Sequence, residues 1–192
     1  MRYTDDHKQT TRQRIIAAAG RRFKQNGIDG SGIAAVMKDA GLTNGAFYAH
    51  FASKDDLVAN VIADQLRTQI ADLDALPPGR AGIEAYVRSY LSPKHRDHPQ
   101  DGCPSAALLD EIGRCGDQAK AVYSDGTQAF VGEIAARLAP EDPQSKLEQV
   151  ASAFALMIGT LQLSRATTDQ ALSAQILERG ARNALDLMHA ES

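Results

Sequence analysis

The chain has 192 residues, of which 43% are hydrophobic, 23% charged and 5% aromatic, and its formal net charge is −3. This length supports one or two small domains with a buried core, and two cysteines exclude a disulfide scaffold. We see no charged-then-apolar leader and no apolar run near about 18 residues, so we expect a soluble cytoplasmic protein without a membrane partner.

The first predicted helix covers residues 6–25. Its apolar stripe consists of Ile15, Ile16, Ala19 and Phe23, which recur at helical spacing. Asn26-Gly27 ends the helix, because glycine readily adopts the left-handed conformation found at helix C-termini.

Two short helices joined by a tight turn are predicted next, near residues 33–40 and 44–50. Gly41 supplies the permissive backbone of the turn, and Thr43 is a good N-cap for the second helix. The buried faces consist of Ile33, Val36 and Met37 on the first helix and Phe47 and Phe51 on the second. This is the shape of a helix-turn-helix, whose second helix enters a DNA major groove.

A longer fourth helix is predicted over residues 53–76, with Ser53 as its N-cap and Asp56 in its first turn. Pro77-Pro78-Gly79 ends it. Further helices are predicted near residues 81–92, 104–114, 117–139, 143–166 and 169–189. We therefore expect an all-α fold of about nine helices, divided into a DNA-binding domain (1–52) and a regulatory and dimerisation domain (53–192) that the fourth helix connects.

The charge is unevenly distributed along the chain. Residues 1–54 carry nine Lys or Arg and four Asp, a balance of 9 − 4 = +5, whereas the rest carries 12 against 20, a balance of −8. A basic end joined to an acidic body suits a protein that contacts phosphate with one end only.

The helix-turn-helix region resembles the TetR/AcrR family of transcriptional repressors. The matching residues are Arg14-Ile15-Ile16-Ala17-Ala18-Ala19, Phe23, Gly27-Ile28, Ala40-Gly41-Leu42-Thr43, Gly45-Ala46-Phe47-Tyr48, His50-Phe51 and Ser53-Lys54. The resemblance covers roughly residues 10–62, and the rest matches only in length and helical character. It implies a repressor that binds a palindromic double-stranded operator as a homodimer and is released by a small-molecule effector.

Side-chain chemistry suggests how the DNA contacts are divided. The expected DNA-binding residues are Ser31, Lys38, Thr43, Asn44, Gly45, Ala46, Tyr48, Ala49, His50 and Lys54. Asn44 can pair with an adenine edge, and Ala46 and Ala49 are small enough to admit the helix and touch a thymine methyl. The resemblance implies phosphate contacts for Tyr48, His50 and Lys54; the alternative for Tyr48 and His50 is packing against the first helix.

One position departs from the family pattern. Gly32 stands where the family usually has a serine or threonine that caps the helix and contacts phosphate. Glycine caps acceptably but has no hydroxyl, so either Ser31 substitutes for it or one contact is missing.

The last two helices are the expected dimer interface. The predicted interface residues are Val150, Phe154, Met157, Ile158, Leu161, Leu177, Ala181 and Leu185. Two helices from each subunit would form a four-helix interface, and Ala151, Ala155 and Gly159 would allow close approach. The alternative is that the apolar stripes face the subunit's own core.

The effector pocket is expected between helices in the middle of the chain. Its candidate lining residues are Tyr86, Tyr90, Cys103, Leu108, Tyr123, Phe130 and Phe154, with a plain core role as the alternative for the aromatic residues. A bound ligand is expected to tilt the fourth helix and change the spacing of the two recognition helices.

Cys103 precedes a helix whose first residue is Pro104, and a helix N-terminus favours the reactive thiolate. Some family members with a similar Gly-Cys respond to electrophiles or oxidants, which makes a thiol-based sensor the alternative function; a small buried cap is the bland alternative. Cys115 lies about 18 Å away if one helix carries both, too far for a disulfide.

His95, His98 and Cys103 carry metal-binding groups, but their long loop offers no fourth ligand, so we expect no metal. The sequence has no Gly-rich phosphate loop, no framed carboxylate pair and no recognisable catalytic triad, so we expect neither an enzyme nor a cofactor. A helical ligand-binding protein without DNA function is the remaining alternative, and it predicts no specific, salt-sensitive duplex binding.

Overall fold

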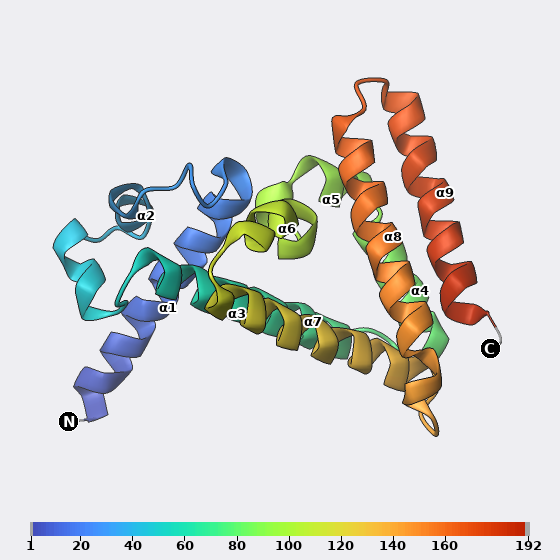
Figure 1. The fold of residues 1–192 in the computed structure, drawn as a ribbon, viewed down its shortest axis with the longest axis horizontal. Coiled ribbons are helices and arrows are strands. Elements are labelled where there is room, and N and C mark those ends of the chain that lie inside the picture. Colours follow the sequence, from blue (N-terminus) through green and yellow to red (C-terminus); the bar gives the residue numbers. More distant parts are fainter. Residues whose placement is uncertain (1, 191–192) are drawn as a thin grey trace.

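The computed structural model describes residues 2–190, and over this range the chain forms nine α-helices and three short 3-10 helices (Figure 1). They are α1 (Arg2–Asn26), α2 (Ile33–Asp39), η1 (Asn44–Ala49), α3 (Lys54–Asp74), α4 (Gly79–Tyr90), α5 (Pro93–Asp97), η2 (Pro99–Asp101), α6 (Pro104–Arg114), α7 (Asp117–Leu138), η3 (Pro143–Lys146), α8 (Leu147–Ala166) and α9 (Gln170–His189). The predicted all-α fold is confirmed.

The helices are arranged around a long central pair. In Figure 1, α3 and α7 run side by side through the middle, with α1, α2 and η1 at one end and the paired helices α8 and α9 at the other. The short helix α6 packs against both α1 and α8, so it touches both ends of the molecule.

Two apolar clusters divide the core. The N-terminal cluster contains the buried side chains of α1, α2, η1 and the first half of α3, and it also takes Leu108 and Ile112 from α6. The second cluster contains the buried side chains of α4, α8 and α9 together with Leu73 near the end of α3 and Phe130 on α7. The helix α3 therefore contributes buried side chains to both clusters and connects them.

Local signals set the helix boundaries near the DNA-binding end. Gly27 has φ +78°, and its N–H donates to the Phe23 carbonyl at 2.8 Å, which closes α1 as predicted. Ser53 Oγ accepts from the Asp56 N–H at 3.1 Å, and Asp56 Oδ2 accepts from the Ala52 N–H at 2.9 Å. This reciprocal capping confirms the predicted start of α3.

Two elements differ from the prediction. The second short helix is a 3-10 helix of six residues, because its N–H groups bond three residues back, as from Ala46 to Thr43 at 3.1 Å and from His50 to Phe47 at 2.9 Å. The segment predicted as a long flexible loop, residues 93–102, contains α5 and η2. Each begins with a proline, which is pre-organised for the first helical position.

No helix between residues 2 and 190 combines the length and the apolar character that crossing a lipid bilayer requires.

Candidate DNA-binding surface and adjoining cavity

The 3-10 helix η1 presents one buried and one exposed face. Phe47 and Phe51 are almost fully buried, with ring centroids 5.6 Å apart, whereas Tyr48 is 69% exposed. The other exposed residues of this segment are Thr43, Asn44, Gly45 and Ala49, while Ala46 and His50 are half-buried. The aromatic pair therefore anchors a surface of small and hydrogen-bonding groups that faces outward.

The turn before η1 is held by α1. Gly41 has φ +68°, a conformation that favours glycine, and the Arg14 guanidinium donates to the neighbouring Ala40 carbonyl at 2.7 Å. Farther along α1, Arg22 pairs with Asp39 at the end of α2 at 2.6 Å. The Arg12 guanidinium lies 4.8 Å from the centre of the Phe51 ring. The exposed face of η1 is thus presented by a braced scaffold.

Two predicted residues differ from their expected roles. Ser31 is fully buried, and its hydroxyl donates to the Gly27 carbonyl at 2.6 Å, so it cannot replace the missing hydroxyl at Gly32. Its hydroxyl instead ties the start of α2 to the end of α1. Thr43 precedes η1 in the extended conformation of an N-cap, but its side chain makes no capping hydrogen bond and faces solvent.

The remaining predicted DNA-binding residues lie around η1. Lys38 is exposed in the last turn of α2, and Lys54 is half-buried at the first position of α3. Burial lowers the pKa of His50, and the positive charges of Lys8 and Arg12 lower it further. Its imidazole is consequently neutral near pH 7, while Lys8 and Arg12 keep the surroundings positive.

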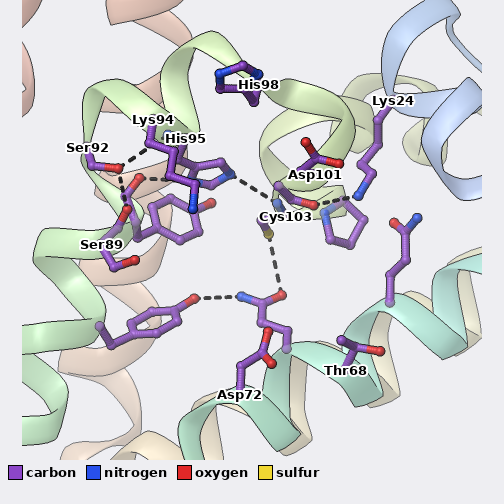
Figure 2. A pocket seen from close by; sticks show the side chains of 16 residues that line it. Lys24, Thr68, Asp72, Ser89, Ser92, Lys94, His95, His98, Asp101 and Cys103 are labelled. Atoms are coloured by element: carbon purple, nitrogen blue, oxygen red, sulfur yellow. Dashed lines mark hydrogen bonds between the residues drawn. The ribbon is translucent and has the colours of Figure 1, made fainter. Parts of the chain in front are cut away.

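A cavity of about 460 Å³ lies between α1, α3, α4 and the segment that leads into α6 (Figure 2). Tyr86, Tyr90 and Cys103 line it, as predicted. Phe130 and Phe154 pack behind them, with ring centroids 5.6 Å from Tyr86 and 6.1 Å from Tyr90 respectively.

Phe130 and Phe154 do not line the cavity and belong to the core, which is the role that the sequence left open as the alternative. Leu108 and Tyr123 do not line it either, because α6 and α7 turn those side chains toward the N-terminal cluster. Leu108 is buried there, and Tyr123 packs against it while its hydroxyl donates to Ser105 Oγ at 2.9 Å.

The cavity floor is a chain of hydrogen bonds. The Cys103 thiol donates to Gln69 Oε1 at 3.4 Å, and Gln69 Nε2 donates to the Tyr86 hydroxyl at 2.7 Å (Figure 2). Gln69 sits on α3 and Cys103 caps α6, so the chain joins these two helices across the floor. The sequence did not identify Gln69, because only the fold brings it near Cys103.

Lys24 reaches the cavity from the opposite side, at the end of α1. Its ammonium donates to the Gly102 carbonyl at 2.7 Å (Figure 2). Burial lowers the pKa of Lys24 to about 8, with Cys103 and Asp101 opposing that shift. This link between α1 and the start of α6 is another feature that the sequence did not reveal.

Both ring nitrogens of His95 are engaged by the backbone. Nδ1 donates to the Tyr90 carbonyl at 2.8 Å, and Nε2 accepts the Cys103 N–H at 3.1 Å. Arg165 of α8 fixes the same segment by donating to the carbonyls of His95 and Arg96 at 2.7 and 3.1 Å. His95 is thus a structural brace, and neither nitrogen has a lone pair to offer a metal.

A family model described as "Bacterial regulatory proteins, tetR family" matches residues 15–61, which span the second half of α1, all of α2 and η1, and the start of α3. By this match, residues 15–61 form a TetR-family DNA-binding region. Members of this family are DNA-binding transcriptional regulators and are not enzymes.

Relatives support this assignment over part of their length. The chain is 40% identical over 60 residues to the HTH-type transcriptional regulator AcrR of Shigella flexneri, covering 31% of this chain and 28% of that protein. It is 30% identical over 106 residues to LmrA of Bacillus subtilis, covering 53% and 56% of the two chains. The chain thus matches about half the length, or less, of these curated relatives.

Solved structures share the whole fold. The reduced form of Escherichia coli NemR superposes with a TM-score of 0.74 at 19% identity, covering 91% of this chain and 95% of that one. A TetR-family regulator from Agrobacterium tumefaciens gives a TM-score of 0.74 at 19% identity, covering 93% and 97%. At this identity the likeness concerns the fold alone.

Glu111 of α6 forms hydrogen bonds with the turn between α1 and α2. Its Oε2 accepts the Ile28 N–H at 2.6 Å and the Asp29 N–H at 3.3 Å. Gly27 leaves room for this carboxylate, since a Cβ at Gly27 would lie 2.9 Å from Glu111 Oε1. Together with the Lys24–Gly102 bond, this contact fastens α6 to the helix-turn-helix at two points.

We expect Glu111→Ala to lower the free energy of unfolding by about 1–3 kcal/mol, because two backbone donors lose a charged acceptor. Glu111→Gln keeps an oxygen at the same place and should lose less than half as much. Urea unfolding of the three chains, followed by circular dichroism, measures both effects. A Glu111→Ala chain within about 0.5 kcal/mol of wild type would show that the contact contributes nothing.

A second prediction concerns His95 and pH. Burial is the main cause that lowers the pKa of His95 below 6.5; the Tyr90 carbonyl opposes this effect, and Arg165 and Lys24 add to it. The folded chain therefore favours the neutral ring more than the unfolded chain does. The resulting stabilisation is complete above about pH 6.5 and is lost as the pH falls through the lower folded-state pKa.

The measurement is urea unfolding of wild type and His95→Gln between about pH 7.5 and pH 5. Wild type should be the more stable chain at the upper pH, and the difference should shrink as the pH falls. Taking the difference cancels the other titrating groups, including His50 and His189, whose pKa values burial also lowers. A difference that stays constant with pH would refute the role assigned to His95.

The predicted dimer residues do not lie on the surface. All eight are buried, and all belong to the second apolar cluster: Val150, Phe154, Met157, Ile158, Leu161, Leu177, Ala181 and Leu185. Helical periodicity identified the apolar stripe correctly, but the stripe packs inside its own chain. The outer faces of α8 and α9 instead expose Leu163, Leu172 and Leu187.

Proposed function

We propose that this chain is a repressor that binds a near-palindromic operator as a homodimer and releases it when a small molecule occupies the cavity. The observation that carries the proposal is the exposed face of η1, held outward by buried Phe47 and Phe51. One helix-turn-helix contacts too little DNA for tight specific binding, so two copies on a two-fold site are expected.

The DNA contacts follow from the chemistry of that face. Asn44 is proposed to read an adenine edge, and Ala46 and Ala49 to lie against the groove floor beside Gly45. The residues proposed to contact phosphate are Lys38, Thr43, Tyr48, His50 and Lys54. A neutral His50 contributes one N–H donor, and an approaching phosphate raises its pKa.

The dimer is proposed to form through the outer faces of α8 and α9. Ala151, Ala155 and Gly159 recur every four residues on the exposed side of α8, where small side chains allow a second helix close. Leu163 and Leu172 flank this stripe and are 59% and 48% exposed.

We retain the division into domains 1–52 and 53–192 and the cytoplasmic location as parts of this proposal.

Release of DNA is proposed to run through the two contacts that fasten α6 to the helix-turn-helix. A ligand in the cavity touches Lys24 on α1 and Gln69 on α3, both of which bond to the segment entering α6. Moving that segment is proposed to shift α6 and therefore Glu111, which lies toward the C-terminal end of α6. Because Glu111 accepts the Ile28 N–H, the turn before α2 would move with it. Ligand and operator thus favour different positions of the same helices.

A reporter assay tests the repressor proposal. The DNA upstream of the chain's own gene drives a fluorescent reporter in a heterologous host that also expresses the chain. Wild type should reduce fluorescence, and Asn44→Ala with Tyr48→Phe should restore it at equal protein level. Equal fluorescence with and without wild type, on this DNA and on operators selected from a random duplex library, would refute repression.

A thiol switch is a second candidate, because the Cys103 thiol lies on the cavity floor. Adding an electrophile to this sulfur would break its bond to Gln69 and fill part of the cavity. N-ethylmaleimide should then release operator DNA from wild type and from Cys115→Ser but not from Cys103→Ser. Release that persists in Cys103→Ser would exclude this switch while leaving the repressor proposal intact.

A further inference from the structure

Among the buried hydrogen-bonding groups of the cavity, donors outnumber acceptors that lack a partner. Tyr90 is 5% exposed, and its hydroxyl makes no geometrically complete hydrogen bond among the described residues, although the Cys103 sulfur lies beside it. The Tyr86 hydroxyl accepts from Gln69, and no described group accepts the Tyr86 proton in turn. Against these donors, Gln65 Oε1 is the one buried lining acceptor in residues 2–190 without a partner. A ligand that satisfies this cavity must be rich in acceptors.

The interior of the cavity also carries a positive charge. Lys24 is half-buried, whereas Asp72, Lys94 and Asp101 are exposed at the mouth. The Lys24 ammonium donates to the Gly102 carbonyl and forms no ion pair with any described carboxylate. An ammonium has three donors, so two remain for a ligand. Because this ammonium is buried without a counterion, its pKa is lowered to about 8.

We propose that the cavity binds a small organic carboxylate with a flat apolar body, its carboxylate paired with Lys24 and its body against Tyr86 and Tyr90. The proposal names the effector class of the repressor proposed above and rests on that function only for the effect on DNA. A volume of about 460 Å³ suits a molecule of one or two rings.

Other ligand classes match these groups less well. A cationic ligand would face Lys24 inside the cavity, and a neutral apolar ligand would bury the ammonium further without a partner. A phosphate ester would bring about two charges to one lysine with two aspartates nearby. A single carboxylate matches the single interior charge, and its oxygens accept from the remaining donors.

Binding at Lys24 has a structural consequence. The carboxylate competes with the Gly102 carbonyl for the ammonium, and that bond is one of the two contacts that fasten α6 to the helix-turn-helix. Lys24 belongs to α1, so the ligand acts directly on a helix of the DNA-binding unit rather than only on the core behind it.

The test pairs acids with their neutral amides. Benzoate, cinnamate and 2-naphthoate are compared with benzamide, cinnamamide and 2-naphthamide by thermal shift and isothermal titration calorimetry on the full chain. At least one acid should raise Tm and bind at least tenfold more tightly than its amide. Amides that bind as well as the acids, or no binding of any acid at 10 mM, would overturn the proposal.

Variants assign the effect to Lys24. Lys24→Met should weaken binding of the acid at least tenfold, Lys24→Arg should retain most of it, and Tyr90→Phe should weaken it severalfold. Lys120→Met removes an exposed lysine of α7 outside the cavity and should leave the affinity within twofold. Wild-type affinity in a folded Lys24→Met chain would refute the assignment.

Proton uptake on binding can be measured on the wild-type chain, with Lys24→Arg as the control. Because the pKa of Lys24 is about 8 and a paired carboxylate raises it, binding at pH 8 should take up about half a proton per site. Calorimetry in phosphate and in Tris measures this uptake, and Lys24→Arg should abolish it. Zero uptake in wild type would contradict the ion pair.

Operator affinity is measured separately without any acid. A failure of the carboxylate proposal is therefore distinguishable from a failure of the repressor proposal.

Discussion

Phe47→Ala should abolish operator binding by unfolding the surface that presents it. Phe47 is fully buried, packs on Phe51 and Tyr48, and belongs to the N-terminal cluster. Truncating a buried phenylalanine costs about 3–5 kcal/mol, and η1 has few backbone bonds of its own to resist that loss. Urea unfolding and anisotropy with operator DNA should show the stability and the affinity falling together.

The matched control is Phe47→Leu, which keeps most of the buried volume and should lose about 1–2 kcal/mol. Phe47→Ala binding operator with wild-type affinity would show that the aromatic anchor is not what holds η1 in place.

Tyr48→Phe should weaken operator binding about 30-fold to 1,000-fold while leaving stability unchanged. A hydrogen bond to a charged phosphate contributes about 1–2 kcal/mol, and the proposed two-fold dimer would lose it at both half-sites. The hydroxyl belongs to a side chain that is 69% exposed, and phenylalanine keeps the ring that packs edge-on against Phe47. Tm and operator affinity should therefore separate, in contrast to Phe47→Ala.

A different result would assign Tyr48 another role. If Tyr48→Phe lowers Tm and leaves the affinity unchanged, the hydroxyl serves the fold, which is the packing alternative drawn from the sequence. Ser124→Ala, which removes an exposed hydroxyl on α7, controls for the loss of any surface hydroxyl and should change neither quantity.

The local elements of this fold were predictable because their causes lie within a few residues. The cap made by Ser53 and Asp56 and the close of α1 at Gly27 depend on side chains within one helical turn. The burial of Phe47 and Phe51 follows from their spacing. The bounds of α6, predicted as 104–114, agree with the structure for the same reason, since Pro104 fixes its start.

The features that join distant parts of the chain were not predictable. Glu111 meets Ile28 across 83 residues, and Lys24 meets Gly102 across 78. Nothing in the local sequence distinguishes these two side chains from ordinary surface charges. The cavity shares this origin, because Gln69 and Cys103 lie 34 residues apart and meet only when α3 and α6 are packed.

Periodicity also left one ambiguity that only packing resolves. The apolar stripes of α8 and α9 were correctly identified, but a stripe does not specify whether its partner is the same chain or another. Here Met157 and Leu177 face their own core. The role of Ser31 was ambiguous for the same reason. Serine is common on DNA-facing surfaces, but Ser31 is buried and its hydroxyl donates to the Gly27 carbonyl.

The salt dependence of operator binding tests the repressor proposal directly. Anisotropy of a labelled duplex from upstream of the chain's own gene is titrated at several salt concentrations, beside a scrambled duplex. We predict nanomolar affinity at low salt, two chains per duplex, and a slope of log K against log salt steeper than about −4, as several phosphate contacts require. A slope near zero, or equal affinity for the scrambled duplex, would contradict the proposal.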